Sequence, residues 1–118
     1  MQHNNEIKLE KQGEVTIFNI RGDLTSFSET SLNQAYQNAN DQDARRILLK
    51  IEEDAYINSG GIALLIQLMA QIKKNRQTVA MAGVSEHFKK IFNMVGITKF
   101  AKIYDSIETA IEAMATES

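Results

Sequence analysis

The sequence predicts a single α/β domain with a mixed, mostly parallel sheet of four to five strands and about four helices, beginning with a β-hairpin. Three observations predict this fold class. The length of 118 residues is that of one domain, and we take residues 1–118 as that domain, with a core of about 6–114. Strand-like and helix-like stretches alternate after residue 22, which is typical of right-handed crossovers and a parallel sheet. Two strand-like stretches at the start are joined by a short connection, which is typical of a hairpin.

The hairpin is formed by residues 6–10 and 14–22. The first stretch, EIKLE, alternates apolar and polar side chains, as does a strand with one buried face. The second, EVTIFNIRG, places apolar side chains on both faces, so we expect it in the interior of the sheet.

Residues 23–40 contain the first helix, because Leu32, Tyr36 and Ala39 recur at helical spacing. Ser28 is the expected N-cap, since its hydroxyl can accept a hydrogen bond from the first turn. Residues 45–51, RRILLKI, form a compact apolar run bounded by charge, which is typical of a buried parallel strand.

The longest helix follows, in the stretch YINSGGIALLIQLMAQIKK of residues 56–74. Its first turns are apolar around most of their circumference, and its polar side chains come later. We therefore expect the N-terminal half of this helix to be deeply buried.

Residues 77–83 predict the next strand, and residues 85–96 predict a helix. Ser85 is the expected N-cap of this helix, and Gly96 is the expected residue just after its end. Its apolar face consists of Phe88, Ile91, Phe92 and Val95.

The chain closes with a short edge strand in residues 100–105 and a helix in residues 105–114. Asp105 and Glu108 have the spacing of a capping box at the start of this helix.

Composition excludes several classes of function. The chain contains no cysteine, so it has neither a disulfide framework nor a thiolate metal site. The 13 Lys and Arg against 15 Asp and Glu make no basic field for direct nucleic-acid binding. The apolar run of residues 62–66 is far shorter than the roughly 20 residues of a membrane span. With a polar start that is unlike a signal peptide, the chain is expected to be cytoplasmic, with no membrane contact.

The sequence also argues against an enzyme or a metal site, and no cofactor is expected. His3 lies at the terminus and His87 lies in a helix among surface charges, and neither has a nucleophile or carboxylate at a useful spacing. Two distant histidines without cysteine do not make a usual metal-ligand cluster. The acids of residues 52–54 follow a strand, where such side chains are usually solvated.

Ser59 admits two interpretations from the residues alone. It lies at or just before the start of the long helix, where a serine is a preferred N-cap, and that is the favoured interpretation. The same position suits a phosphate, because free N–H groups and the helix dipole favour negative charge there. Gly60 and Gly61 then leave the backbone accessible to a partner or a kinase.

Three blocks of the sequence, in order, carry a resemblance to a known family. VTIFNIRGDLT resembles a strand that ends in xGxLD, and residues 58–63, NSGGIA, resemble a D-S-[SA]-G-[LIV]-[GA] turn. The third block has a matching apolar pattern: Val84, Phe88, Ile91, Phe92, Met94, Gly96, Ile97, Phe100 and residues 103–110. Over about residues 6–114 the chain resembles the bacterial STAS domain of anti-sigma-factor antagonists.

This resemblance implies a partner-switching protein. The unphosphorylated antagonist binds an anti-sigma factor that is also a serine kinase, and so releases a sigma factor for transcription. The kinase phosphorylates the serine of the turn, which corresponds to Ser59, and the modified antagonist dissociates. A metal-dependent serine/threonine phosphatase restores it. We expect a monomer or weak dimer.

The expected partner surface combines the start of the Ser59 helix with the loop after Gly22. It consists of Asp23, Leu24, Thr25, Tyr56, Asn58, Ser59, Gly60 and Gly61. Tyr56 is equally well interpreted as a partly buried aromatic at a strand end. The chain has Asn58 and Thr25 where the family usually has aspartate.

Two alternatives remain. The chain could be a STAS scaffold or accessory subunit of a larger signalling or transport assembly, without phosphorylation. A STAS domain that binds a small molecule or nucleotide would show a ligand-dependent melting temperature, and no residue pattern specifically supports it.

Overall fold

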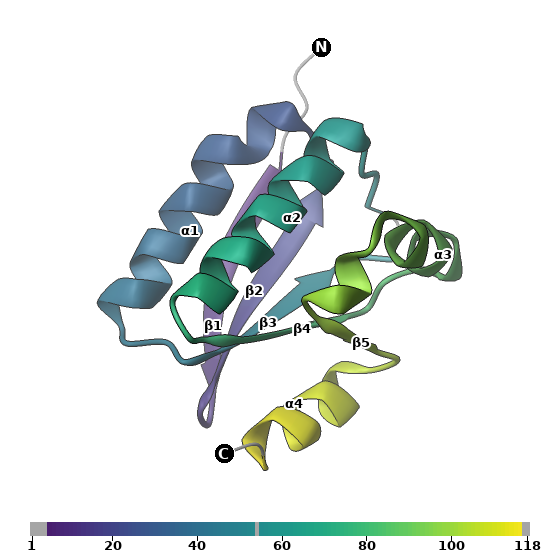
Figure 1. The fold of residues 1–118 in the computed structure, drawn as a ribbon. Coiled ribbons are helices and arrows are strands. Elements are labelled where there is room, and N and C mark those ends of the chain that lie inside the picture. The colour runs from purple at the N-terminus through teal and green to yellow at the C-terminus, as the bar shows by residue number, and fades with distance from the viewer. Residues whose placement is uncertain (1–4, 54, 117–118) are drawn as a thin grey trace.

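In a computed structural model, residues 5–53 and 55–116 are described, and they form one five-stranded sheet with helices on both faces (Figure 1). His3 and Asp54, considered above, lie outside the described residues. In chain order the elements are β1 (Asn5–Gln12), β2 (Val15–Gly22), the 3-10 helix η1 (Ser26–Ser28), α1 (Glu29–Asp41), β3 (Arg46–Ile51), α2 (Ser59–Lys74), β4 (Thr78–Ala82), α3 (Glu86–Val95), the 3-10 helix η2 (Ile97–Lys99), β5 (Lys102–Tyr104) and α4 (Ile107–Ala115).

The strand order confirms the predicted mixed α/β sheet. The strands lie in the order β1-β2-β3-β4-β5, and β1 pairs antiparallel with β2 as the predicted hairpin. The other three pairings are parallel, because each crossover helix returns the chain to the same end of the sheet. β5 lies at the edge, as expected for residues 100–105.

One face of the sheet carries the main core. A row of apolar side chains in register crosses all five strands at Leu9, Phe18, Leu49, Met81 and Ile103. This row belongs to one apolar cluster with buried side chains of α1, α2 and α3. These three helices therefore cover the same face.

The opposite face is covered by α4. Ala110 and Met114 of this helix are buried against Val15, Ile17 and Leu48. β2 thus packs apolar side chains on both of its faces, as its continuous apolar run predicts.

The burial of α2 differs from the prediction. Leu65 is fully buried, but Ile62 and Leu64 in the first half are only partly buried, and Ala63 is exposed. The second half of the helix also contains buried side chains, those of Leu68, Met69 and Ile72. The prediction of a deeply buried N-terminal half is wrong, because the helix packs along one side on the sheet and its other side stays open.

The ends of α3 are as predicted, and its apolar face is shorter than predicted. The Ser85 hydroxyl accepts a hydrogen bond from the Phe88 N–H at 3.2 Å, and Gly96 ends the helix with φ of 86°. Val95 is 46% exposed, contrary to its expected place on the apolar face. After Gly96 the chain turns into η2, and Ile97 takes the buried position instead.

The cap of α4 also differs from the prediction. Ser106 is the N-cap, and its hydroxyl accepts a hydrogen bond from the Thr109 N–H at 3.1 Å. Asp105 lies one residue earlier and accepts a hydrogen bond from the Lys89 ammonium at 2.7 Å. That bond holds the pKa of Asp105 below its usual value and raises the pKa of Lys89. The capping box of Asp105 and Glu108 is therefore wrong, because the acid joins α3 to the segment before α4 instead.

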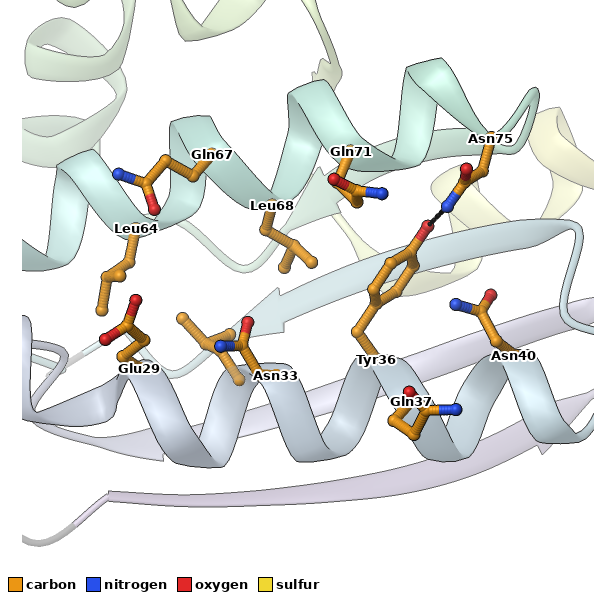
Figure 2. A pocket seen from close by; sticks show the side chains of 11 residues that line it. Glu29, Asn33, Tyr36, Gln37, Asn40, Leu64, Gln67, Leu68, Gln71 and Asn75 are labelled. Atoms are coloured by element: carbon orange, nitrogen blue, oxygen red, sulfur yellow. Dashed lines mark hydrogen bonds between the residues drawn. The ribbon is translucent and has the colours of Figure 1, made fainter.

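A partly buried polar network ties the far ends of α1 and α2 to the start of β4. The Tyr36 hydroxyl donates to Gln77 Oε1 at 2.6 Å and accepts from Asn75 Nδ2 at 2.7 Å, the bond drawn in Figure 2. Gln77 Nε2 donates in turn to Asn40 Oδ1 at 2.7 Å and to the Ala44 carbonyl at 2.8 Å. One glutamine thus joins α1 and the loop after it to the segment just before β4, more than 30 residues later in the sequence.

Replacing Tyr36 with phenylalanine removes the hydroxyl from this network. Because Gln77 and Asn75 then lose a partner in a partly buried site, we expect the free energy of unfolding to fall by about 1–2 kcal/mol. Urea denaturation measures the change. Tyr56→Phe is the matched control, since this tyrosine is exposed, and it should change stability by less than about 0.5 kcal/mol. Equal stability of Tyr36→Phe and wild type would contradict the expected role of the network.

Candidate functional site

The fold brings the two predicted interface segments together beyond the C-terminal ends of β2 and β3. The loop after β2 and the segment before α2 form an isolated parallel bridge between Leu24 and Ile57. The Leu24 N–H donates to the Tyr56 carbonyl at 2.8 Å, and the Asn58 N–H donates to the Leu24 carbonyl at 3.2 Å. Backbone hydrogen bonds therefore hold the loop after β2 next to the segment before α2, although the two are more than 30 residues apart in sequence.

Asn58, and not Ser59, is the N-cap of α2. Its side-chain oxygen accepts a hydrogen bond from the Gly61 N–H at 2.9 Å. Ser59 is the first residue of the helix and is exposed. The interpretation of Ser59 as an ordinary N-cap is therefore wrong. Asparagine and serine are both good caps, and here the asparagine one residue earlier takes that position.

The two glycines of the turn serve a close internal contact. A Cβ on Gly61 would overlap the carbonyl oxygen of Leu24, and a Cβ on Gly60 would lie 2.9 Å from the backbone nitrogen of Ser26. Gly61 is buried and Gly60 is partly buried. The glycines thus let the first turn of α2 pack against the loop after β2, in addition to any access that they leave for a partner.

Thr25 holds η1 in place. Its hydroxyl accepts a hydrogen bond from the Phe27 N–H at 3.1 Å, and its own N–H donates to the Ser28 hydroxyl at 3.0 Å. These two bonds form a capping box on η1, and Thr25 is only 3% exposed. Thr25, for which the resemblance implies an aspartate, is therefore a structural residue here.

Ser28 does not cap α1 with its side chain, so that prediction is wrong. The residue occupies the N-cap position, but its hydroxyl makes no cap hydrogen bond to α1. The hydroxyl accepts the Thr25 N–H instead, because η1 precedes α1 directly and uses the same serine.

The predicted site residues divide by exposure. Tyr56 is 57% exposed, and Ser59 is exposed nearby in sequence, which favours the surface interpretation of Tyr56. Three residues are partly exposed: Asp23, Asn58 and Gly60. Three are buried: Leu24, Thr25 and Gly61. In the free domain only the exposed and partly exposed residues of the predicted surface are therefore accessible to a partner.

Sequence reasoning missed Phe27, which is 81% exposed on η1. A signal was present: this phenylalanine stands among serine, threonine and glutamate, outside the apolar stripe of the following helix. A large apolar residue outside the periodic apolar positions of a helix or strand is not expected to be buried in the core.

A groove lies between α1 and α2. Its volume is about 420 Å³. Figure 2 shows side chains of both helices along it, with Leu64 and Leu68 on the α2 side. Its polar lining consists mainly of amides: Asn33, Gln37, Asn40, Gln67, Gln71 and Asn75. These groups donate and accept hydrogen bonds without charge, and Glu29 is the carboxylate among the lining residues. The groove does not concentrate acid–base or nucleophilic groups.

The remaining candidates for chemistry lie apart from one another. His87 is exposed on α3, where its ring meets the edge of Phe88 at a centroid distance of 5.2 Å. Within residues 5–53 and 55–116, no three His, Asp or Glu side chains are grouped so as to hold a metal ion. No helix in the same ranges is long and apolar enough to cross a bilayer.

Comparison with known families agrees with this geometry. The family model described as "STAS domain" matches residues 6–110, which is most of the chain. The chain belongs to the STAS domain family. The match includes β1 to the first turn of α4, and so contains the whole Leu24–Ile57 bridge and the start of α2.

Solved structures with the same fold include anti-sigma factor antagonists. One from Mycobacterium paratuberculosis has a TM-score of 0.78 at 12% identity, over 95% of this chain and 95% of its own. A STAS protein of Planctomyces limnophilus has a TM-score of 0.66 at 20% identity, over 94% and 99%. The Bacillus cell fate determinant SpoIIAA in its phosphorylated form has a TM-score of 0.62 at 17% identity, over 91% and 97%. At these identities the likeness establishes the STAS fold alone.

Proposed function

We propose that this STAS domain is an anti-sigma-factor antagonist that binds an anti-sigma serine kinase and is switched off by phosphorylation of Ser59. The observation that carries the proposal is the exposure of Ser59 at the first position of α2, beside the Asn58 cap. The likeness in fold to antagonists, and to SpoIIAA in a phosphorylated form, supports it.

The start of α2 suits a switch of this kind. A phosphate on Ser59 would add about −1.5 to −2 charges where free backbone N–H groups and the helix dipole favour an anion. The first turn of α2 contains no acidic residue that would repel it. A dianion pressed against a close-fitting partner would lose its water, which opposes binding. The free domain therefore tolerates the phosphate better than a complex does.

The proposal predicts a single phosphate on Ser59. We expect incubation of the protein with an anti-sigma kinase from the same organism and ATP to add one phosphate, seen by intact mass and located by peptide sequencing. Ser59→Ala should abolish the addition, while Ser26→Ala, an exposed serine on the neighbouring η1, should leave it unchanged. In a binding titration, Ser59→Asp should weaken the complex by about 100-fold. A kinase that binds the protein tightly and never phosphorylates it would contradict this proposal.

The alternative is a STAS scaffold or accessory subunit without phosphorylation. The neutral Asn58 and Thr25 favour it, because both positions usually carry an aspartate in the family and both serve here as structural caps. The same kinase experiment decides between the two, since a scaffold would bind its assembly equally well with Ser59→Asp.

The proposed cycle has a second enzyme. A metal-dependent serine/threonine phosphatase would remove the phosphate and restore binding. Exposure of Ser59 on the first turn of a helix is compatible with access by both enzymes.

A further inference from the structure

Phe27 is held in an exposed position by a defined local structure. The Phe27 N–H donates to the Thr25 hydroxyl, and the Ser28 N–H donates to the Thr25 carbonyl at 2.9 Å. η1 is also pressed against α2, since a Cβ on Gly60 would lie 2.9 Å from the Ser26 nitrogen. The side chain is thus displayed on a fixed turn next to the Ser59 end of α2.

A second exposed aromatic lies on the adjoining segment. The Tyr56 carbonyl accepts the hydrogen bond from Leu24 that joins the two loops, and its side chain is 57% exposed. In the described part of the chain the exposed large apolar side chains are Phe27, Tyr56, Met94 and Val95, so both aromatics of this set lie on or next to the two segments that the Leu24–Ile57 bridge joins. Single exposed apolar residues are common, but exposed aromatics on neighbouring rigid segments are typical of binding anchors.

The segments that carry these aromatics, with their neighbours in sequence, contain more acidic than basic residues. Among described residues of 21–30 and 52–59, Asp23, Glu29, Glu52 and Glu53 carry carboxylates. Arg21 is the base in these segments, and it pairs with Glu52 at 3.6 Å. An excess of carboxylates on these segments fits a partner with basic side chains.

We propose that Phe27 and Tyr56 anchor the partner contact, by entering an apolar pocket of the anti-sigma kinase that basic side chains surround. This inference rests on the proposed function and specifies the surface that it uses. Fully desolvated aromatic anchors near the centre of an interface usually contribute most of the affinity, while charged rims set the association rate. A phosphate on Ser59 would then have to lose its water close to these anchors, which explains release even from a basic partner.

The test is a binding titration with the purified anti-sigma kinase of the same organism. We expect Phe27→Ala to weaken binding by about 30-fold, the effect of a hot-spot side chain, and Tyr56→Ala by about tenfold. Met94→Ala is the matched control: its side chain is 84% exposed, but it lies near the end of α3. That control should change affinity by less than about threefold. Phe27→Leu, which keeps an apolar side chain, should restore part of the loss.

Exposed residues can be changed without unfolding the domain, so each variant should keep the wild-type melting temperature within about 2 °C. The association rate should fall as salt rises, in wild type and Phe27→Ala alike, because the partner rim is basic. Wild-type affinity in Phe27→Ala, or a loss no greater than in Met94→Ala, would overturn the inference, as would a salt-independent association rate.

The outcomes separate this inference from the proposed function. If Ser59→Asp weakens binding and Phe27→Ala does not, the phosphorylation switch stands and the anchor fails. If Phe27→Ala weakens binding and Ser59 is never phosphorylated, the role of Phe27 in binding is supported and the phosphorylation switch is contradicted.

Discussion

Gly61→Ala is expected to lower the free energy of unfolding by about 3 kcal/mol. The added methyl group would overlap the Leu24 carbonyl oxygen and meet the Ile57 Cγ2 at 3.1 Å, so α2 or the loop after β2 must move. Movement would strain the bridge between Leu24 and Ile57 and the cap of Asn58 on Gly61. Because backbone atoms form the obstacle, a rotamer change cannot relieve it.

Helix propensity alone predicts that Gly61→Ala raises the free energy of unfolding. Alanine is favoured over glycine in a helix by up to about 1 kcal/mol. Urea denaturation of Gly61→Ala therefore separates a local effect from a tertiary one. Ser59→Ala is the matched control, because it places the same side chain at an exposed position of the same turn, and it should change stability by less than about 0.5 kcal/mol. A more stable Gly61→Ala would show that the predicted close approach does not exist.

Leu24→Ala is expected to lower the free energy of unfolding by about 3 kcal/mol, within the usual range for a buried leucine. Leu24 is fully buried in the main core and also supplies backbone bonds to Tyr56 and Asn58. Truncating the side chain leaves a cavity but keeps those backbone bonds. The folded fraction of the variant should therefore bind the proposed kinase within about threefold of wild type.

This variant tests whether Leu24 supports the surface or contacts the partner. Both stability and affinity are measured, and affinity is corrected for the folded fraction. Leu64→Ala is the comparison, since the same truncation at a partly buried leucine on the α1–α2 groove should cost less, about 1–2 kcal/mol. A loss of affinity above about tenfold in folded Leu24→Ala would make Leu24 a partner contact, as the sequence had suggested.

The strands and helices could be predicted because their signals are local. β3 is a continuous apolar run and β1 alternates, and those patterns depend only on which side of a strand faces the core. Ser85 and Gly96 were identified correctly because a cap depends on a few neighbouring residues. Two of the cap errors came where neighbouring residues competed for one position, as with Asn58 against Ser59 and Ser106 against Asp105.

The candidate site was predicted only in part. The sequence located its two segments, at residues 23–25 and 56–61, mainly through the resemblance to STAS domains. It assigned surface roles to Leu24, Thr25 and Gly61, which are buried, and it missed Phe27, which is exposed. No local pattern distinguishes a glycine that clears space for a partner from one that clears space for a carbonyl elsewhere in the chain.

The amino-acid sequence by itself determined the α/β class, the opening hairpin, the order of elements and the serine at the start of α2, because periodicity and turn chemistry act over short stretches. Tertiary structure alone decided which residues near that serine face solvent. Contacts between segments more than 30 residues apart determine this exposure. They are the Leu24–Ile57 bridge and the close packing of the backbone of residues 24–26 against Gly60 and Gly61. Those contacts bury one side of each loop and leave Phe27, Tyr56 and Ser59 on the other.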